Sequence, residues 1–156
     1  AHDPVDVADI LVDAAADARA VQPGRTMTVD VPDASIHIEG DDARLRQVVA
    51  ALVHNALVHT SEDVTVRLAA RDRGNGLVEL SVTDDGPGLT ADEAALVFER
   101  FVRGDHSRSR HTGGSGLGLP IAQSIIAAHN GTLTLDTEPG AGCTFRIMLP
   151  ANRNDS

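Results

Sequence analysis

The sequence predicts an α/β fold, a two-layer sandwich in which a mixed β-sheet is covered on one face by about three helices. Two observations predict it. Apolar residues recur at helical spacing in some segments and alternate in others, and the two kinds of segment are interspersed along the chain. In addition, several neighbouring strands are separated only by turn residues, which indicates antiparallel hairpins within the sheet.

The first part of the chain is predicted to form two helices and two strands. Apolar residues repeat on one helical face over 5–21, and Pro23-Gly24 ends that run. Short alternations predict strands over 27–31 and 36–38. Either Asp41 or Asp42 is expected to cap a second helix, which contains the segment 44–60.

The second part is predicted to add two hairpins and two further helices. Strands over 64–68 and 78–82 are joined by the turn at 73–76, and a short helix is expected over 91–98. The segment 99–116 is rich in charge and glycine, so we interpret it as a mobile loop. A helix over 117–129 is expected to stop at Asn130-Gly131, before a last hairpin with strands over 133–135 and 145–149. Residues 1–150 thus form one predicted domain, and 151–156 a polar tail.

Composition narrows the possible functions. At 156 residues the chain suits one domain with a sizeable core. Its formal charge of −10 argues against nonspecific binding to nucleic acid or to an anionic membrane surface. The absence of Trp and Tyr disfavours recognition by aromatic stacking, and the single Cys143 is compatible with a reducing compartment. No apolar run approaches the length of a membrane span.

Asp84 stands at the end of an apolar strand, and Gly86 and Gly88 follow it at alternate positions. A carboxylate there can accept a hydrogen bond from an exocyclic amine such as that of adenine, and the glycines let a flat base lie against the backbone. The alternative is a simple tight turn, because Asp-Gly-Pro-Gly is also typical of turns.

The segment 113–119, Gly-Gly-Ser-Gly-Leu-Gly-Leu, runs directly into the last predicted helix. Such a segment presents unpaired backbone N–H groups and the positive end of a helix dipole to a phosphate. It is not a Walker loop, since no Lys-Ser or Lys-Thr follows, and it is not a dinucleotide fingerprint, since no strand precedes it. A flexible linker is the alternative.

Asn55 is one of three polar residues, with His54 and His59, that interrupt the apolar helix over 44–60. Its neutral oxygen suits Mg²⁺ when a triphosphate already supplies the negative charge. A hydrogen-bonded or solvent-facing Asn is the alternative. Zinc at the two histidines is not favoured, because residues five apart do not lie on the same face of a helix and no further ligand cluster appears.

Four arginines crowd into the 99–116 region of an otherwise acidic chain: Arg100, Arg103, Arg108 and Arg110. Arginine makes bidentate contacts to phosphate, so the loop could close over a polyphosphate. A solvated basic loop, or a docking surface for an acidic protein, would have the same composition.

Taken in this order, the segments resemble the ATP-binding catalytic domain of bacterial sensor histidine kinases. These proteins share a superfamily with gyrase, the large heat-shock chaperones and MutL-type repair proteins. The resemblance covers residues 3–150 and places the N box at 44–56, the first glycine box at 84–89, the F box at 97–103 and the second glycine box at 114–119. The F box and the Gly-Leu-Gly-Leu run are typical of the kinase branch.

The resemblance implies a Bergerat-type fold that binds ATP and Mg²⁺ between the N-box helix and a lid over residues 99–116. Asn55 would ligate Mg²⁺ and, with Arg103, support catalysis. Asp84 would bind the adenine amine, with Gly86 and Gly88 beside the base. The implied ATP-contacting residues are Asn55, His59, Asp84, Gly86, Gly88, Arg103, Gly114, Ser115, Gly116, Leu117, Gly118 and Thr144.

Two positions depart from the family pattern. Ala51 replaces a second Asn that many members carry, and Val58 replaces a common Lys. Superfamily ATPases place a catalytic Glu at the position of Ala51. Alanine cannot act as a base, so hydrolysis by that mechanism is disfavoured and another phosphoryl acceptor is expected.

None of the seven His residues stands in the family's phosphoacceptor pattern. The resemblance therefore implies an upstream dimerisation domain that carries the acceptor, a response regulator as partner, and a homodimeric, membrane-anchored parent whose cytoplasmic part includes this chain. The isolated domain is expected to be monomeric and not to bind nucleic acid. Two alternatives stay open, a serine-directed anti-sigma-factor-like kinase of the same superfamily and a non-catalytic nucleotide-binding module.

Overall fold

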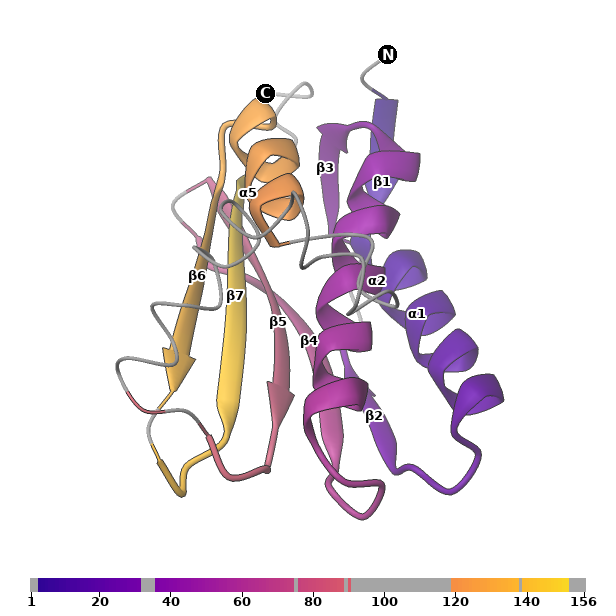
Figure 1. Ribbon diagram of the computed structural model, residues 1–156. Coiled ribbons are helices and arrows are strands. Elements are labelled where there is room, and N and C mark those ends of the chain that lie inside the picture. The colour runs from indigo at the N-terminus through magenta and orange to yellow at the C-terminus, as the bar shows by residue number, and fades with distance from the viewer. Residues whose placement is uncertain are drawn as a thin grey trace.

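The chain folds into a sheet layer and a helix layer (Figure 1). The computed structural model describes residues 3–31, 36–74, 76–88, 90, 119–137 and 139–151. In chain order the elements are β1 (Asp3–Asp6), α1 (Val7–Val21), β2 (Met27–Asp30), β3 (His37–Gly40), α2 (Asp42–His59), β4 (Val66–Asp72), β5 (Leu77–Asp84), α5 (Leu119–Ala128), β6 (Thr132–Thr137) and β7 (Cys143–Pro150).

The main sheet has five strands in the order β2-β4-β5-β7-β6. Strands β2 and β4 run parallel, with Met27 opposite Val66, because the chain crosses over through α2 between them. The remaining pairs are antiparallel, and the hairpins β4–β5 and β6–β7 are those predicted. The prediction of a mixed sheet is confirmed.

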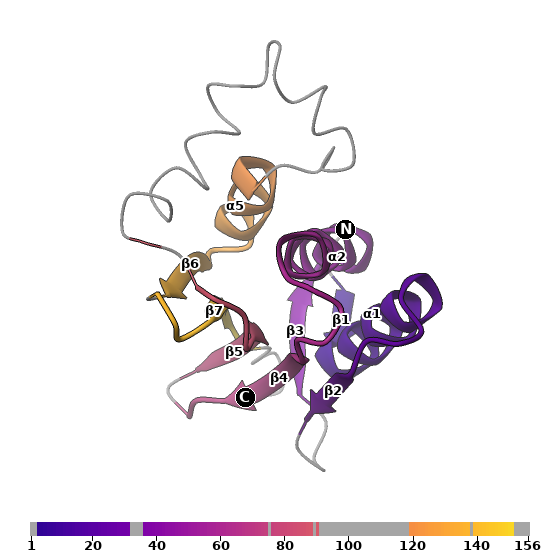
Figure 2. The same ribbon diagram turned by 60° about the horizontal axis from the view of Figure 1, so that its bottom comes forward.

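Helices α1, α2 and α5 cover one face of this sheet, which is clearest when the molecule is seen from its end (Figure 2). Alternate strand residues point into the layer between helices and sheet, and they form one core with the inward faces of the helices. Fully buried members include Leu11, Leu52, Leu68, Leu80, Ile126 and Ile147. The other face is polar, and there Arg146 contacts Glu79 and Asp136 across three strands.

The first helix begins later than predicted. Val5 belongs to β1, and Asp6 caps α1 by accepting a hydrogen bond from the Ala8 backbone N–H at 2.9 Å. Strand β1 pairs antiparallel with β3 in a separate two-stranded sheet, in which Val5 lies opposite Ile38. The strand predicted over 36–38 overlaps β3, but β1 and its pairing with β3 were not predicted, because β1 has only four residues and its partner lies far away in the sequence.

Other boundaries shift by a few residues. Val64 lies in a turn before β4, where its N–H donates to the Ser61 carbonyl, and Asn130 adopts a left-handed φ of 65° that ends α5 as predicted. The predicted helix over 91–98, the loop over 99–116 and residues 152–156 lie outside the described residues. No helix in the described part of the chain is both long and apolar enough to cross a membrane.

Candidate functional site

Helix α2 crosses the sheet and ends beside the carboxyl end of β5, at the same end of the molecule (Figure 1). Asp41 caps its first turn, since the Asp41 side chain accepts from the Arg44 N–H at 3.2 Å. Near this start, Arg46 contacts Asp13 of α1 at 2.6 Å and Asp42 at 2.7 Å. These hydrogen bonds raise the pKa of the Arg46 guanidinium and tie α2 to α1.

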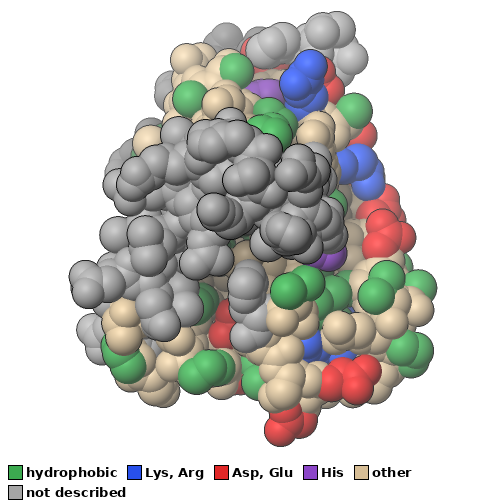
Figure 3. All heavy atoms as spheres, viewed as in Figure 1, with side chains coloured by type: hydrophobic (Ala, Val, Ile, Leu, Met, Phe, Trp, Pro, Cys, Tyr) green, Lys and Arg blue, Asp and Glu red, His purple; other side chains and the backbone are tan. Residues whose placement is uncertain are grey.

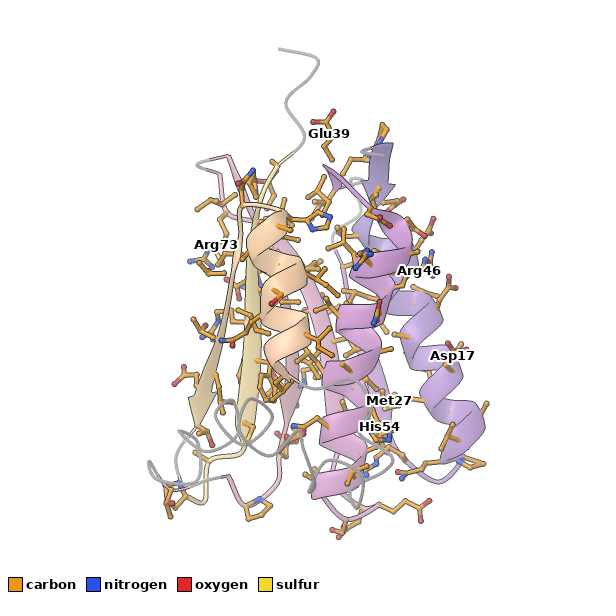
Figure 4. The ribbon with its side chains drawn as sticks, turned by 45° about the horizontal axis from the view of Figure 1, so that its top comes forward. Asp17, Met27, Glu39, Arg46, His54 and Arg73 are labelled. Carbon is orange, nitrogen blue, oxygen red and sulfur yellow. The ribbon has the colours of Figure 1, made fainter. Side chains whose placement is uncertain are left out.

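The outer side of α1 carries exposed acidic residues, Asp9, Asp13 and Asp17. Acidic side chains are visible along this edge in Figure 3, and Figure 4 labels Asp17 on α1 and both Arg46 and His54 on α2. The contact of Arg46 with Asp13 therefore joins α2 to the acidic side of α1. It holds the first half of α2 in place, at a distance along the helix from Asp84.

Asp84, the last residue of β5, is only 6% exposed. Its Oδ1 accepts a hydrogen bond from the Gly86 N–H at 2.9 Å. Within the described residues, no hydrogen bond engages its Oδ2. The carboxylate is thus oriented by the turn that follows it, and its second oxygen can still accept a hydrogen bond.

The two glycines after Asp84 are required for different reasons. A Cβ added at Gly86 would lie 2.8 Å from Thr60 Cγ2 and 2.9 Å from Asp84 Oδ1, so the position has no room for a side chain. Gly88 has a φ of 74°, which L-residues rarely adopt. The segment is therefore a tight turn that also shapes a surface beside Asp84, and the two sequence interpretations are compatible.

The turn between β6 and β7 supports this segment from the other side. Gly142 has a φ of 77°, and a Cβ added there would overlap the Asp84 carbonyl oxygen. The Gly140 N–H donates to the Pro87 carbonyl at 2.6 Å. This support was not predicted, although the Gly-x-Gly spacing of Gly140 and Gly142 was an available signal of a close backbone approach.

The structure does not bring Thr144 to the Asp84 side of the sheet. Thr144 lies opposite Thr83, and their hydroxyls are 3.2 Å apart on the face away from the helices. Cys143, one residue earlier, lies opposite Asp84 and approaches the Thr137 hydroxyl at 3.3 Å. Burial raises the pKa of the Cys143 thiol, the hydrogen bond with Thr137 lowers it less, and the charge of Asp84 raises it further.

Asn55 is half-buried on α2, and within the described residues it forms no hydrogen bond through its side chain. No group of three or more His, Cys, Asp or Glu able to hold a metal occurs among the residues that the structure describes. A single neutral oxygen without a carboxylate cage fits a Mg²⁺ ion held mainly by phosphates, and it does not fit zinc.

The two departures from the family pattern lie in different surroundings. Ala51 is buried at 7% exposure, whereas Val58 is 59% exposed near the end of α2. His59 closes α2, but its side chain lies outside what the structure describes, as do Arg103 and Gly114, Ser115, Gly116, Leu117 and Gly118. The described half of the site therefore consists of the end of α2, the Asp84–Gly88 turn and the turn at Gly142.

Comparisons with known proteins agree with this geometry. Residues 40–153 match the family described as histidine kinase-, DNA gyrase B-, and HSP90-like ATPase. Similar curated proteins of Mycobacterium tuberculosis include the probable sensor histidine kinase TcrY, 46% identical over 149 residues, and the sensor histidine kinase TrcS, 42% identical over 151 residues. Each alignment covers 94% of this chain but only 30% of TcrY and 29% of TrcS, so the chain spans less than a third of these relatives.

Solved structures agree as well. The ATP binding domain of PrrB from Mycobacterium tuberculosis is 31% identical with a TM-score of 0.74, and the match covers 97% of this chain and 98% of that chain. The mycobacterial sensor histidine kinase MprB is 29% identical with a TM-score of 0.80, covering 97% of this chain and 99% of that chain. The chain therefore belongs to the histidine kinase-, DNA gyrase B- and HSP90-like ATPase family, as an ATP-binding catalytic domain of the sensor histidine kinase type.

Proposed function

We propose that this chain binds Mg-ATP and transfers the γ-phosphoryl group to a histidine on the dimerisation domain of the same sensor kinase, for relay to a response regulator. The parent is a membrane-anchored homodimer whose cytoplasmic part includes this domain. The presence of further domains is supported by the relatives, of which the chain spans about 30%.

The observation that carries the proposal is the state of Asp84. Its carboxylate is nearly buried, is oriented by the Gly86 N–H and has one oxygen without a hydrogen bond among the described residues. An exocyclic amine, as in adenine, would supply the missing donor. The guanine carbonyl at the same place would set two acceptors against each other, and a buried unpaired acceptor costs about 1–3 kcal/mol.

Similarity to a nucleotide complex supports the same conclusion. ShkA, whose full-length structure was solved in complex with AMPPNP, is 33% identical to this chain with a TM-score of 0.79. The match covers 97% of this chain and 31% of that chain. AMPPNP stands in for ATP, so a similar domain occurs in a protein that binds an adenine triphosphate.

Asn55 is the residue that we assign to the metal. When bound, Mg²⁺ neutralises part of the phosphate charge, and Asn55 would contribute one neutral oxygen to it. The predicted phosphate contacts of Arg103 and of residues 114–118, and the contact of His59 with the nucleotide, are part of the same proposal.

Transfer to another domain is favoured over hydrolysis. Ala51 is buried at the position where related ATPases place their base, and its methyl group cannot activate water. None of the seven His residues has the phosphoacceptor pattern, so the acceptor belongs to another part of the parent protein.

Calorimetry with ATP and GTP tests the nucleotide assignment. Asp84→Ala should weaken ATP binding by roughly ten-fold or more, because the adenine amine loses its acceptor. Asp85→Ala is the matched control, since the exposed side chain of Asp85 is engaged by Arg67 at 3.5 Å. Equal affinity of the wild type for ATP and GTP would contradict the role of Asp84.

Labelled ATP tests the transfer. The chain alone should neither label itself nor release phosphate at a useful rate, and it should label the parent's upstream helical domain when that domain is added. Stable phosphate on the isolated chain, or rapid phosphate release, would contradict the proposal. Label on a serine of a partner would instead identify the anti-sigma-factor-like type of kinase.

A further inference from the structure

Arg25, in the turn between α1 and β2, is a buried cation at only 4% exposure. Its five N–H groups make six hydrogen-bond contacts, because Nη1 with two N–H groups reaches three acceptors. Nε donates to Gln22 Oε1 at 3.0 Å, and the other donors reach the Thr60 hydroxyl (2.8 Å) and the carbonyls of Leu57 (3.1 Å), Thr60 (3.2 Å), Ser61 (2.7 Å) and Val64 (2.9 Å). Arg25, from a distant part of the chain, therefore supplies hydrogen-bond donors to the carbonyl groups at the C-terminal end of α2.

This arrangement is unusual for a helix end. The last carbonyls of a helix lack partners within it and carry a partial negative charge, which a glycine-based cap or water commonly satisfies. A buried charge is costly unless every donor is used, and in the described part of the chain Arg25 forms no ion pair with a carboxylate. The chain thus places a buried guanidinium where a simple cap would end the helix.

One contact leads from Arg25 directly to the Asp84 turn. The Thr60 hydroxyl accepts from Arg25 and donates to the Ala56 carbonyl at 2.6 Å, so its rotamer is held from two sides. Its methyl carbon Cγ2 then lies against Gly86, at 2.8 Å from where a Cβ would be. Gly86 in turn orients the Asp84 carboxylate.

A second path runs through the backbone. Arg25 holds the carbonyls of Ser61 and Val64, which bracket the turn before β4. The next residue, Thr65, accepts from the Asp85 N–H at 3.3 Å, and Val66 lies opposite Asp84 in the sheet. Both paths end at the same three residues, Asp84 to Gly86.

We propose that Arg25 is a positioning residue for the base end of the nucleotide site, which it orders by clasping the end of α2 and, through Thr60, the Asp84–Gly86 turn. This inference rests on the proposed role of Asp84 in binding adenine. If Arg25 were purely structural, its replacement would lower only the stability of the domain. Replacing a positioning residue also changes how well the folded domain binds and selects its nucleotide.

Hydrogen exchange without nucleotide tests the positioning directly. In Arg25→Gln, the Gly86 amide should exchange at least about ten-fold faster than in the wild type through local opening of the turn, while the Ile147 amide in the core strand β7 reports the change in global stability. Arg19→Gln is the matched control, because Arg19 is exposed and donates to a single carbonyl, that of Met27, at 2.9 Å. Unchanged local exchange at Gly86, with acceleration at Ile147 alone, would reduce the role of Arg25 to overall stability.

Calorimetry then tests the consequence, at a temperature where circular dichroism shows the variant folded. Arg25→Gln should bind ATP about ten-fold more weakly and lose part of its preference over GTP, while Arg19→Gln binds as the wild type does. Wild-type affinity in folded Arg25→Gln would overturn the proposal. A wild type that binds no ATP would contradict the proposed function, and the exchange experiment would still decide the positioning.

Thr60 variants keep the test decisive if Arg25→Gln does not fold. Thr60→Ser keeps the hydroxyl that Arg25 binds and removes the methyl against Gly86, whereas Thr60→Val does the reverse. Both should accelerate Gly86 exchange and weaken ATP binding several-fold. Unchanged exchange and affinity in both variants would overturn the link from Arg25 to the turn.

Discussion

The two ends of α2 are held by opposite chemistry. At the start, the Asp41 backbone N–H donates to His129 Nε2 at 3.0 Å, and His129 Nδ1 donates to the Ile125 carbonyl at 2.8 Å. At the far end, Arg25 donates to carbonyls and to a hydroxyl. The start of a helix exposes N–H groups and needs an acceptor, while its end exposes carbonyls and needs donors.

A glycine also lies beside the residue that holds each end of α2. A Cβ at Gly40 would lie 2.6 Å from His129 Cδ2, and one at Gly86 would lie 2.8 Å from Thr60 Cγ2. The side chains of His129 and Thr60 therefore each pack against a glycine, where another residue's Cβ would collide with them. The two ends differ in their neighbours: the end held by Arg25 contacts the Asp84 turn, and within the described part of the chain the end held by His129 does not. Damage at the two ends should accordingly have different effects on nucleotide binding.

The largest expected effect on stability is at the Arg25 end. Arg25→Gln should lower the free energy of unfolding by about 3 kcal/mol, because several buried carbonyls lose a charged donor at once. Urea unfolding of the isolated domain measures this change. A loss below about 1 kcal/mol would mean that water or a rearranged turn replaces the guanidinium easily.

The effect at the His129 end should be smaller and confined to stability. His129→Leu leaves the Asp41 N–H without its acceptor, which should cost about 2 kcal/mol in urea unfolding. Arg46→Gln is the control at the same end, and it should cost less than about 1 kcal/mol because its ion pairs are exposed. Folded His129→Leu should bind ATP normally, and a weakened affinity there would show that the two ends are coupled.

The glycine pair should give the smallest change in stability and the clearest contrast. Gly40→Ala and Gly86→Ala should each lower the free energy of unfolding by about 1 kcal/mol, since each added methyl group forces a side chain to move. Only Gly86→Ala should also weaken ATP binding several-fold. Calorimetry on the two variants measures the contrast, and equal ATP affinities would mean that the Asp84 turn tolerates displacement.

Local patterns in the sequence were sufficient for much of the fold. A cap at Asp41 or Asp42, the stop at Asn130 and the hairpins β4–β5 and β6–β7 were predicted from residues close together in the chain. The structure confirms them and identifies Asp41 as the cap. The pairing of β1 with β3 was missed for the opposite reason. Its partners are separated by the whole of α1 and β2, so no local pattern reports it.

In the site, too, local patterns predicted some residues and missed a feature that depends on strand pairing, as Thr144 and Cys143 show. The order of the glycine-rich segments in the sequence pointed to Asp84, Gly86 and Gly88, whose turn the structure shows. Thr144 was predicted for the adenine end, but register places Thr144 opposite Thr83 and puts Cys143 opposite Asp84. A shift of one residue along a strand changes the face, and only the pairing of β5 with β7 decides it.

The fold class, the order of the motifs and the residues with the chemistry to bind a base or a metal could thus be predicted from the amino-acid sequence, because periodicity and turn propensity are properties of short segments. The contacts by which Arg25 and His129 hold the two ends of α2, and by which Gly142 supports the Asp84 turn, became known from the folded structure. The physical reason is that helix ends and strand faces are satisfied by whatever the fold brings near them. Those partners come from segments that have no pattern in common with the residues they hold.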